Sequence, residues 1–500
     1  MARWVGLDVD LSATWHEDVG LGALRLGGCS ACGRSIPETG GVELPRGAFE
    51  LGRASGEPAV PSRPVLDVRR LRHDPDGVTA DLARRGIAAS EVKALVELDA
   101  AVRSAAQRRD EARADVKRLS KEVGGARKAG DGATAERLQV ESRTRGEEAA
   151  EADAGVSVLE EELRQALLVT PNTPDPAAPE GTGPQDNRVV RTWTPTGVPF
   201  TEAHYVACQR VPHWEVAAQH GLLDLERGAK MSGSMFPLWR GDGARLLRGL
   251  TSWALDRHTT DAKAGSVWEE VRPPTLVKTA TMVATGHLPK FEEDMYHLER
   301  DDLWAIPTAE VPLTSLARDE LLEVAALPLK LCAYTPCFRR EAGSAGRDTR
   351  GLLRSHEFDK VELMAVCTAD QALGLQAEIL ARAEGLLRDL GLAHRVLDLC
   401  AGDLGFSSMR TFDIEVWSPG VGAWLEVSSV SWYGDYQARR AGIRHRVEGG
   451  GTAVASTVNG SALAWPRVVA ALLEANRQED GSVRVPPPVR PWVGGLSRLG

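Results

Sequence analysis

The sequence predicts an α+β protein, in which a long antiparallel helical hairpin precedes a larger mixed body with antiparallel strands. First, residues 90–169 place apolar side chains at the alternating three–four spacing of a coiled coil, broken once by a Gly/Asp-rich turn. Second, residues 335–363 have the pattern of a strand, a loop of small residues and another strand. Third, the β-prone run at 425–429 is expected on a central antiparallel strand.

The domain boundaries follow from changes in amino-acid composition and hydrophobic periodicity along the chain. Its 500 residues exceed one ordinary hydrophobic core, so at least two domains are expected. We expect an N-terminal extension at 1–64, a helical-arm domain at 65–170, a proline-rich linker at 171–190 and the mixed body at 191–500.

Composition argues against several classes of protein. The chain is 43% hydrophobic and 26% charged, as is typical of soluble globular proteins. A net charge of −10 argues against a broadly basic surface, so we expect no DNA partner and only a local nucleic-acid contact. The seven cysteines are scattered, apart from Cys29 and Cys32, which fits a reducing compartment. Without a signal peptide or an apolar run of membrane-spanning length, a cytoplasmic protein is expected.

The hairpin at 90–169 is the clearest periodic element. From Leu95 to Val123 its seam is apolar except at Arg109, and a turn at 130–132 ends the first limb. Two long helices joined by a tight turn should project as an antiparallel arm. A solvated coiled coil that braces or dimerises the fold is one interpretation, and an arm that grips the phosphates of an RNA duplex is the other. The basic side chains available for RNA are Arg108, Arg109, Arg113, Lys117, Arg118, Lys121, Arg127 and Lys128.

The run at 335–363 concentrates cations between regularly placed acids, around a loop of small residues. Guanidinium groups that converge on such a loop suit a polyphosphate, because Arg binds phosphate bidentately and keeps its charge. From composition alone, surface ion pairs on a solvated hairpin are the alternative. The six cations are Arg339, Arg340, Arg347, Arg350, Arg354 and Lys360.

This run resembles motif 2 of the class II aminoacyl-tRNA synthetases, in the form of the bacterial-type seryl-tRNA synthetases, on the residues TPCFRREAGSAGRDTRGLLRSHEFDKVEL. The segments at 288–299 and 400–417 follow the same family, and the resemblance covers roughly residues 65–495. It implies an antiparallel sheet flanked by helices and an arm that contacts tRNA(Ser). It also implies a homodimer formed through the segment at 265–277, where a helix and a strand ending in proline are expected.

The resemblance assigns roles in ATP binding. Arg339 would hold the α-phosphate and the serine carboxylate, Glu341 would bind the adenine amino group, and Phe358 would stack on the base. Glu426 and Ser429 would bind Mg²⁺ and the α-phosphate. The residues implied in catalysis are Arg339, Arg467 and Glu426. Those implied in ATP binding are Arg339, Arg340, Glu341, Arg354, Phe358, Glu426, Val427, Ser428, Ser429 and Arg467.

The resemblance also implies a pocket for L-serine. Thr308 and Glu310 would hold its ammonium group, and Glu362 would accept its hydroxyl. A pocket built to hydrogen-bond a hydroxyl can reject an alanine-sized competitor by about four to five orders of magnitude, because the buried acceptor would be left unpaired. The full set implied is Thr308, Ala309, Glu310, Arg339, Glu362, Asn459 and Ser461.

Two segments depart from the family. Motif 3 normally reads NGSGLAVGR, whereas residues 459–467 read NGSALAWPR, with Ala462 and Pro466 in place of glycines and Trp465 as added bulk. A methyl group where the backbone packs closely takes space from the nucleotide, and proline is tolerated in a helix only in the first turn. At 431–433, Ser-Trp-Tyr stands where the family has Ser-Asn-Cys.

The activity implied by the resemblance is that of a serine–tRNA ligase. Serine and ATP would give seryl-adenylate, and the seryl group would pass to tRNA(Ser), with selenocysteine tRNA as a further candidate acceptor. The alternatives are a specialised or inhibitor-resistant paralogue that supplies activated serine to a secondary pathway, and a catalytically decayed RNA-binding homologue.

The first 64 residues have no counterpart in the family, which usually begins with text that matches Val65 and the three residues after it. We therefore expect the true start at Val65, from a GTG codon. The alternative is a genuine extension in which Cys29 and Cys32 bind a metal.

Overall fold

The computed structural model describes residues 67–260, 267–342 and 350–500, which belong to one compact unit, Val60–Gly500. Among the helices in these three ranges, none combines the length and the apolar character needed to cross a membrane. The predictions that lie outside the described residues concern the extension at 1–64, its Cys29–Cys32 pair, the start at Val65, the beginning of the segment 265–277, and Arg347.

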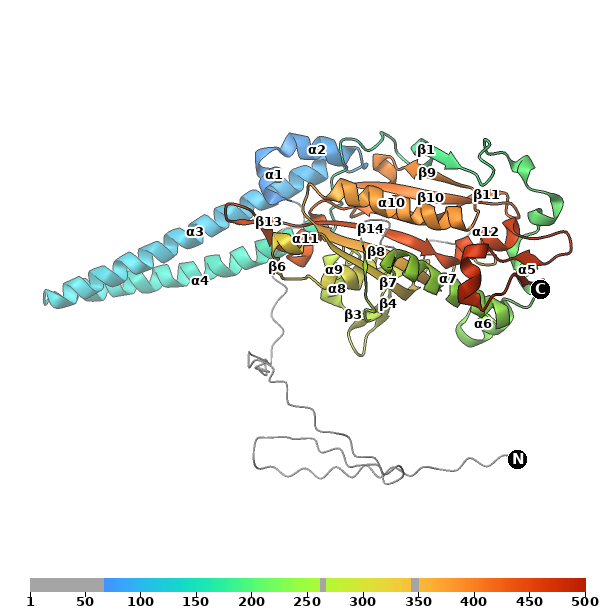
Figure 1. The fold of residues 1–500 in the computed structure, drawn as a ribbon. Coiled ribbons are helices and arrows are strands. Elements are labelled where there is room, and N and C mark those ends of the chain that lie inside the picture. Colours follow the sequence, from blue (N-terminus) through green and yellow to red (C-terminus); the bar gives the residue numbers. More distant parts are fainter. Residues whose placement is uncertain (1–66, 261–266, 343–349) are drawn as a thin grey trace, which may run out of the picture. The chain divides into compact units, whose positions relative to one another are not determined.

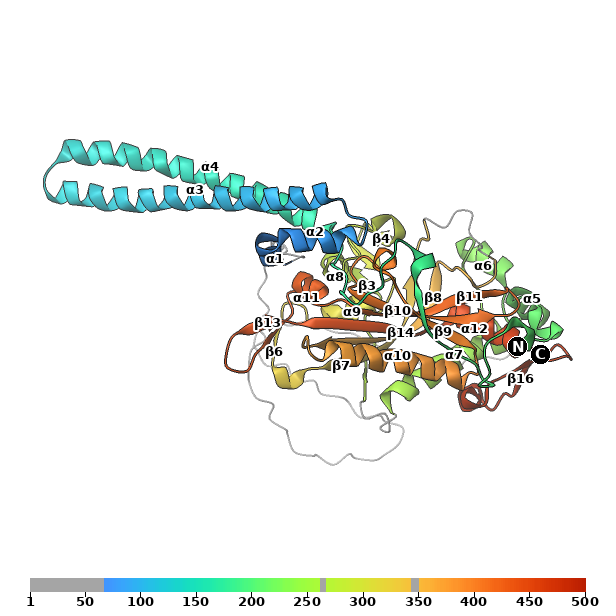
Figure 2. The same ribbon diagram turned by 90° about the horizontal axis from the view of Figure 1, so that it is seen from above.

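The predicted helical arm opens the described chain as α1 (Val68–His73), α2 (Pro75–Ala83), α3 (Ala89–Lys128) and α4 (Gly132–Leu168). Helices α3 and α4 lie side by side along their length (Figures 1 and 2). Asp131 caps α4 by accepting a hydrogen bond from the backbone N–H of Thr134 at 3.0 Å. The turn before it uses Gly130, whose φ of 76° lies in the region that glycine adopts without strain.

The seam of the arm follows the predicted three–four spacing. Leu119 of α3 and Leu138 of α4 are buried there. Arg109 interrupts the apolar stripe, and its guanidinium lies 2.9 Å from Asp110 and 3.7 Å from Asp153 of the opposite helix. An ion pair between the helices therefore takes the place of an apolar contact at that position.

An eight-stranded sheet forms the centre of the body. In spatial order its strands are β1 (Arg188–Trp193), β9 (His394–Asp398), β10 (Arg410–Ser418), β11 (Ala423–Trp432), β14 (Ser456–Ala464), β8 (Glu357–Cys367), β7 (Leu329–Phe338) and β2 (Glu269–Glu270). Neighbouring strands are antiparallel except for β2 and β7. This arrangement confirms the predicted α+β class.

One face of the sheet carries the main apolar core. The helices that share this core are α7 (Gly241–Thr259), α10 (Ala372–Asp389) and α12 (Trp465–Ala475). Val361 and Leu363 of β8 point into it. Because successive side chains of a strand alternate between faces, Glu362 points to the opposite face. That face holds the candidate site.

The opposite face is bordered by short elements that pack against β8 and β14. These are α8 (Thr279–Ala284), α9 (Glu310–Ser315) and α11 (Tyr436–Ala441). A small sheet of β3 (Leu276–Lys278), β5 (Leu303–Ala305) and β4 (Tyr296–Leu298) packs against α8. Helix α5 (His213–Gln219) contacts α12.

The cation-rich run forms the expected hairpin. Strands β7 and β8 pair in register from Leu329 opposite Val366 to Phe338 opposite Glu357. The residues on either side of the hairpin loop therefore emerge next to each other at one end of these two strands.

The segment at 265–277 differs from the expectation of a helix followed by a strand. Its described part holds the short strand β2 and the beginning of β3, and the nearest preceding helix, α7, ends at Thr259. The other part of the expectation, a strand that leads into proline, is present as β2 followed by Pro273 and Pro274.

The predicted linker at 171–190 is in part a packed segment. Asn172 is buried, and its side-chain amide donates to the backbone carbonyls of Ser407 at 2.9 Å and Tyr433 at 2.8 Å. Strand β1 begins at Arg188, inside the predicted linker, because it pairs with β9. Composition revealed the prolines but not these long-range contacts.

Candidate active site

A cavity of about 720 Å³ lies over the ends of β7, β8, β11 and β14, on the face opposite the main core. It gathers residues that are far apart in the sequence. The predicted residues that line it are Thr308, Glu310, Arg339, Glu341, Arg354, Phe358, Glu362, Glu426, Val427, Ser428, Ser429, Asn459, Ser461 and Arg467.

Two predicted residues do not line the cavity. Ala309 is fully buried in a small apolar cluster with Leu313 and Met364. Arg340 instead lies over the ring of Tyr296, with its guanidinium carbon 6.0 Å from the ring centre. Its backbone N–H donates to the carbonyl of Asp294 at 2.9 Å. Arg340 therefore fixes the start of the hairpin loop in this structure.

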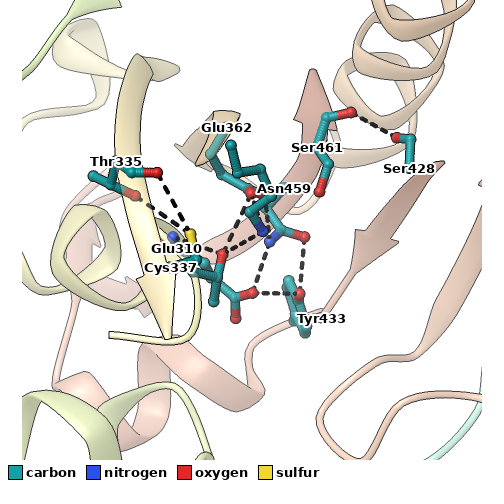
Figure 3. A network of polar contacts seen from close by, with 10 residues as sticks. Glu310, Thr335, Cys337, Glu362, Ser428, Tyr433, Asn459 and Ser461 are labelled. Atoms are coloured by element: carbon teal, nitrogen blue, oxygen red, sulfur yellow. Dashed lines mark hydrogen bonds and ion pairs between the residues drawn. The ribbon is translucent and has the colours of Figure 1, made fainter. Parts of the chain in front are cut away.

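The amino-acid end of the cavity is a buried polar network (Figure 3). Asn459 of β14 stands between two carboxylates, donating to Glu310 at 2.7 Å and to Glu362 at 3.1 Å. Lys360 approaches Glu362 at 2.5 Å and donates to the hydroxyl of Thr308 at 2.7 Å. All five side chains are at least nine-tenths buried.

Glu310 is a buried carboxyl group whose two oxygens both accept hydrogen bonds within this network. Gln437 of α11 donates to one of its oxygens at 2.5 Å, and Asn459 donates to the other. Burial and the nearby charge of Glu362 raise the pKa of Glu310 to about 7. Near neutral pH this group therefore sits close to the midpoint between its neutral and charged forms.

Sequence reasoning missed one residue of the network, Gln437, and left two others without a role: Tyr433, noted only within the departure at 431–433, and Lys360. Tyr433 and Gln437 both contact Glu310, but nothing in their local sequence predicts it. Lys360 was counted among the cations only. Its spacing of two residues from Glu362 along a strand, which places both on one face, was the signal available.

The hairpin ends supply the phosphate-binding candidates. Arg339 lies with its guanidinium carbon 5.2 Å from the centre of the Phe358 ring, a cation–π arrangement across the hairpin. Arg354 pairs with Glu341 at 2.6 Å, so the two residues expected on phosphate and adenine contact each other here. Glu341 has a positive φ of 52°, which turns its side chain at the strand end.

On the other side of the cavity, Arg467 bridges the returning limb of the hairpin and β11. Its guanidinium donates to the carbonyl of Leu353 at 3.1 Å and to the carbonyl of Glu426 at 3.0 Å. The Glu426 carboxylate lies 3.9 Å away, so the guanidinium closes the space between the end of the hairpin and β11.

The residues at the predicted magnesium position suit a hard cation. Glu426 is half exposed to the cavity, and a bulge in β11 follows it, after which Ser429 pairs with Asp413 of β10. In the described part of the chain, one oxygen of Asp413 is buried without a hydrogen-bond partner. Burial and the charge of Glu426 hold the pKa of Asp413 well above its usual range. Such oxygen donors fit Mg²⁺, which usually combines one or two carboxylates with waters and substrate phosphates.

Two of the three motif 3 departures lie away from the cavity, whereas Pro466 lines it. Ala462 and Trp465 are fully buried in the main core, so the Trp465 ring, expected as added bulk beside Arg467, packs into that core instead. Pro466 occupies the first turn of α12, where proline removes no helical hydrogen bond. The register of β14 against β8 shifts between Ser461 and Ala464, beside these changes.

The basic residues predicted to contact RNA all lie on α3. Seven of the eight are exposed, and Arg109 is the exception because it sits in the seam. Some already have acidic neighbours on the arm, such as Arg118 with Asp115 and Glu122, both at 3.1 Å.

Two family models match the chain. One, described as "Seryl-tRNA synthetase N-terminal domain", matches residues 65–174. The other, described as "tRNA synthetase class II core domain (G, H, P, S and T)", matches residues 291–476.

Curated relatives match over nearly their whole length. The serine–tRNA ligase of Pelotomaculum thermopropionicum is 43% identical over 445 residues, which cover 87% of this chain and 100% of the relative. The serine–tRNA ligase of Synechococcus elongatus is 43% identical over 433 residues, which cover 86% of this chain and 98% of the relative.

Solved structures of seryl-tRNA synthetases are similar to this fold. The seryl-tRNA synthetase of Pyrococcus horikoshii complexed with ATP has a TM-score of 0.78 at 30% identity, covering 87% of this chain and 99% of that one. The cytoplasmic serine–tRNA ligase of Naegleria fowleri in complex with AMP has a TM-score of 0.76 at 23% identity. The match covers 87% of this chain and 98% of that one, and it supports the fold. With relatives this similar over almost their full length, the chain belongs to the seryl-tRNA synthetase family of class II aminoacyl-tRNA synthetases.

Proposed function

We propose that the protein is a serine–tRNA ligase, which activates serine with ATP and transfers the seryl group to tRNA(Ser). One observation carries this proposal: a single cavity joins a buried pair of carboxylates, Glu310 and Glu362, to a set of arginines. The carboxylates suit the ammonium and hydroxyl groups of an amino acid, and guanidinium groups suit phosphates.

In the first reaction, a carboxylate oxygen of serine attacks the α-phosphorus of ATP, and pyrophosphate leaves as the new P–O bond forms. The serine carboxylate is already ionised, so no protein base is needed. The protein contributes position and positive charge. We assign Arg339 to the α-phosphate and the serine carboxylate, and Arg354 and Arg467 to the phosphates that leave.

The nucleotide site needs two rearrangements of the ligand-free contacts. Glu341 must release Arg354 to meet the adenine amino group, and Arg339 must leave the Phe358 ring so that the base can stack there. Glu426 and Ser429 would hold Mg²⁺, with Val427 and Ser428 on the same strand beside the phosphates. When bound, Mg²⁺ supplies additional positive charge to the triphosphate.

In the second reaction, a hydroxyl of the terminal tRNA ribose attacks the carbonyl carbon of seryl-adenylate, and AMP leaves. The nucleophile belongs to the tRNA. We assign the arm to the tRNA backbone, because exposed arginines and lysines follow α3. We further propose that the protein acts in the cytoplasm as a homodimer and that selenocysteine tRNA is a second acceptor.

The two alternatives are not favoured. A decayed homologue would have no reason to keep both the charged cavity and the arm. Of the changes that suggested a specialised paralogue, Ala462 and Trp465 lie in the core, while Pro466 and Tyr433 border the cavity. The curated relatives that match over nearly their whole length are serine–tRNA ligases, which favours that activity.

The test is charging of a tRNA(Ser) transcript with radiolabelled serine by the full chain. The double variant Lys117→Glu and Lys121→Glu should raise KM for tRNA about tenfold or more, because each reversed charge repels a phosphate. KM for serine should not change. Lys93→Glu, on the same helix but at the base of the arm, is the matched control. Absence of serine charging by the unmodified chain would contradict the proposed function.

A further inference from the structure

Tyr433 occupies the centre of the amino-acid network, at one of the positions where this chain departs from its family. Its ring is buried, and its hydroxyl oxygen lies 2.8 Å from Oδ1 of Asn459 and 3.1 Å from a carboxylate oxygen of Glu310. Figure 3 shows the hydroxyl pointing at both groups. A phenol at this place can therefore act on the two residues assigned to serine.

The orientation of the Asn459 amide is decided by its neighbours. Its nitrogen faces carboxylate oxygens of Glu310 and Glu362, at 2.7 and 3.1 Å. Turning the amide over would aim its carbonyl oxygen at two carboxylates, an arrangement without a donor. The carbonyl oxygen must therefore face Tyr433, whose hydroxyl hydrogen it accepts.

A phenol has one hydrogen to give. With that hydrogen on Asn459, the contact between the Tyr433 oxygen and Glu310 has no proton unless the carboxyl group carries one. The protein groups thus supply one donor fewer than this point needs, and an ammonium group brings three. The arrangement is complementary to a primary amine.

Resting on the proposed function, we propose that Tyr433 is a positioning residue for serine: its hydroxyl holds the Asn459 amide between Glu310 and Glu362. Asn459 in turn keeps the two carboxylates apart and aims them at the substrate. Without the hydroxyl, the carbonyl oxygen of Asn459 loses its donor, and the amide is free to rotate away from the carboxylates.

A matched pair of variants tests this. Tyr433→Phe removes the hydroxyl and no ring volume. Tyr436→Phe makes the same change three residues away, where the buried hydroxyl donates to the carbonyl of Thr170 at 2.6 Å and touches no assigned serine-binding group. Serine-dependent exchange of pyrophosphate into ATP gives the kinetic constants, and thermal melting checks that both variants fold.

We expect Tyr433→Phe to raise KM for serine about tenfold, with kcat and KM for ATP within about twofold of the unmodified enzyme. The preference for serine over alanine should fall, because Asn459 also supports the hydroxyl acceptor Glu362. Tyr436→Phe should leave these constants unchanged. A KM for serine in Tyr433→Phe no higher than in Tyr436→Phe would overturn the assignment. If the unmodified enzyme showed no serine-dependent exchange, the proposed function would fail instead.

Discussion

At the scale of single residues, the site depends on how burial sets the charge of Glu310. The pKa of this carboxyl group rises to about 7 through desolvation and the charge of Glu362, while the hydrogen bond from Gln437 and the charge of Lys360 oppose that rise. An ammonium group is attracted by the carboxylate and not by the neutral acid. The protonation state of Glu310 should therefore control how well serine binds.

This predicts a pH dependence. Because the raised pKa leaves more of Glu310 protonated as the pH falls, kcat/KM for serine should decline below about pH 7, approaching tenfold per pH unit. KM for ATP at saturating serine should not follow the same curve. Exchange assays between pH 5.5 and 8.5 measure both. A value of kcat/KM for serine that stays flat over this range would show that Glu310 does not bind the ammonium group.

The sequence could locate most of these residues but not their contacts. Motif positions identified Glu310, Glu362 and Asn459, because family motifs keep their spacing. The contacts of Tyr433 and Gln437 with Glu310 depend on where α11 packs against α9, which no local pattern encodes. Trp465 was expected to add bulk beside Arg467, yet its side chain is fully buried in the main core.

At the scale of elements, the β7–β8 hairpin needs an anchor for its returning limb. His213 of α5 accepts a hydrogen bond from the backbone N–H of Leu352 at 3.0 Å through Nε2. Its Nδ1 therefore carries the hydrogen and donates to Glu474 at 2.8 Å. Both His213 and Glu474 are fully buried. Since the next residue, Leu353, accepts from Arg467, this anchor reaches the cavity.

Replacing His213 with Ala should weaken both the fold and the nucleotide site. The substitution leaves the Leu352 N–H and the Glu474 carboxylate without this hydrogen-bond partner. Each loss should lower the free energy of unfolding by about 1–3 kcal/mol. Melting temperature should drop and KM for ATP should rise. His220→Ala, at the end of the same helix, removes a contact with the carbonyl of Gly481 away from the cavity and serves as the control. Equal effects of the two substitutions on KM for ATP would refute the anchoring role.

Periodicity predicted the elements better than their boundaries. The three–four spacing identified α3 and α4, and the strand–loop–strand pattern identified β7 and β8, because both patterns follow from which side chains are buried. Strand β1 was missed inside the predicted linker because a strand at the sheet edge depends on its partner, β9, more than on its own sequence.

At the scale of the whole molecule, Arg85 links the arm to the catalytic body. Its guanidinium donates to five backbone carbonyls, and burial lowers its pKa to about 10. Four of those carbonyls belong to residues 404–408, a loop that lines the cavity in part, and the fifth belongs to Asn172, just after α4. A planar fork with five N–H groups suits such a set, and an ammonium group does not.

Arg85→Lys should therefore loosen the junction. The variant keeps the charge but cannot reach all five carbonyls, and we expect it to lower the free energy of unfolding by about 1.5–3 kcal/mol. Because the loop borders the substrates, the exchange rate should fall as well. Arg84→Lys is the control, since Arg84 binds the carbonyls of Asp175 and Ala178 instead. Denaturant unfolding and exchange assays in which the two variants behave alike would contradict the role of Arg85.

Serine-dependent exchange of pyrophosphate into ATP measures whether the charged cavity activates serine. The full chain should exchange with serine and, at matched concentrations, far less with threonine, alanine or cysteine. Arg339→Ala should abolish this exchange while the protein still binds tRNA(Ser), because Arg339 lies in the cavity and the arm is unchanged. No exchange with any amino acid, or full exchange by Arg339→Ala, would contradict the account.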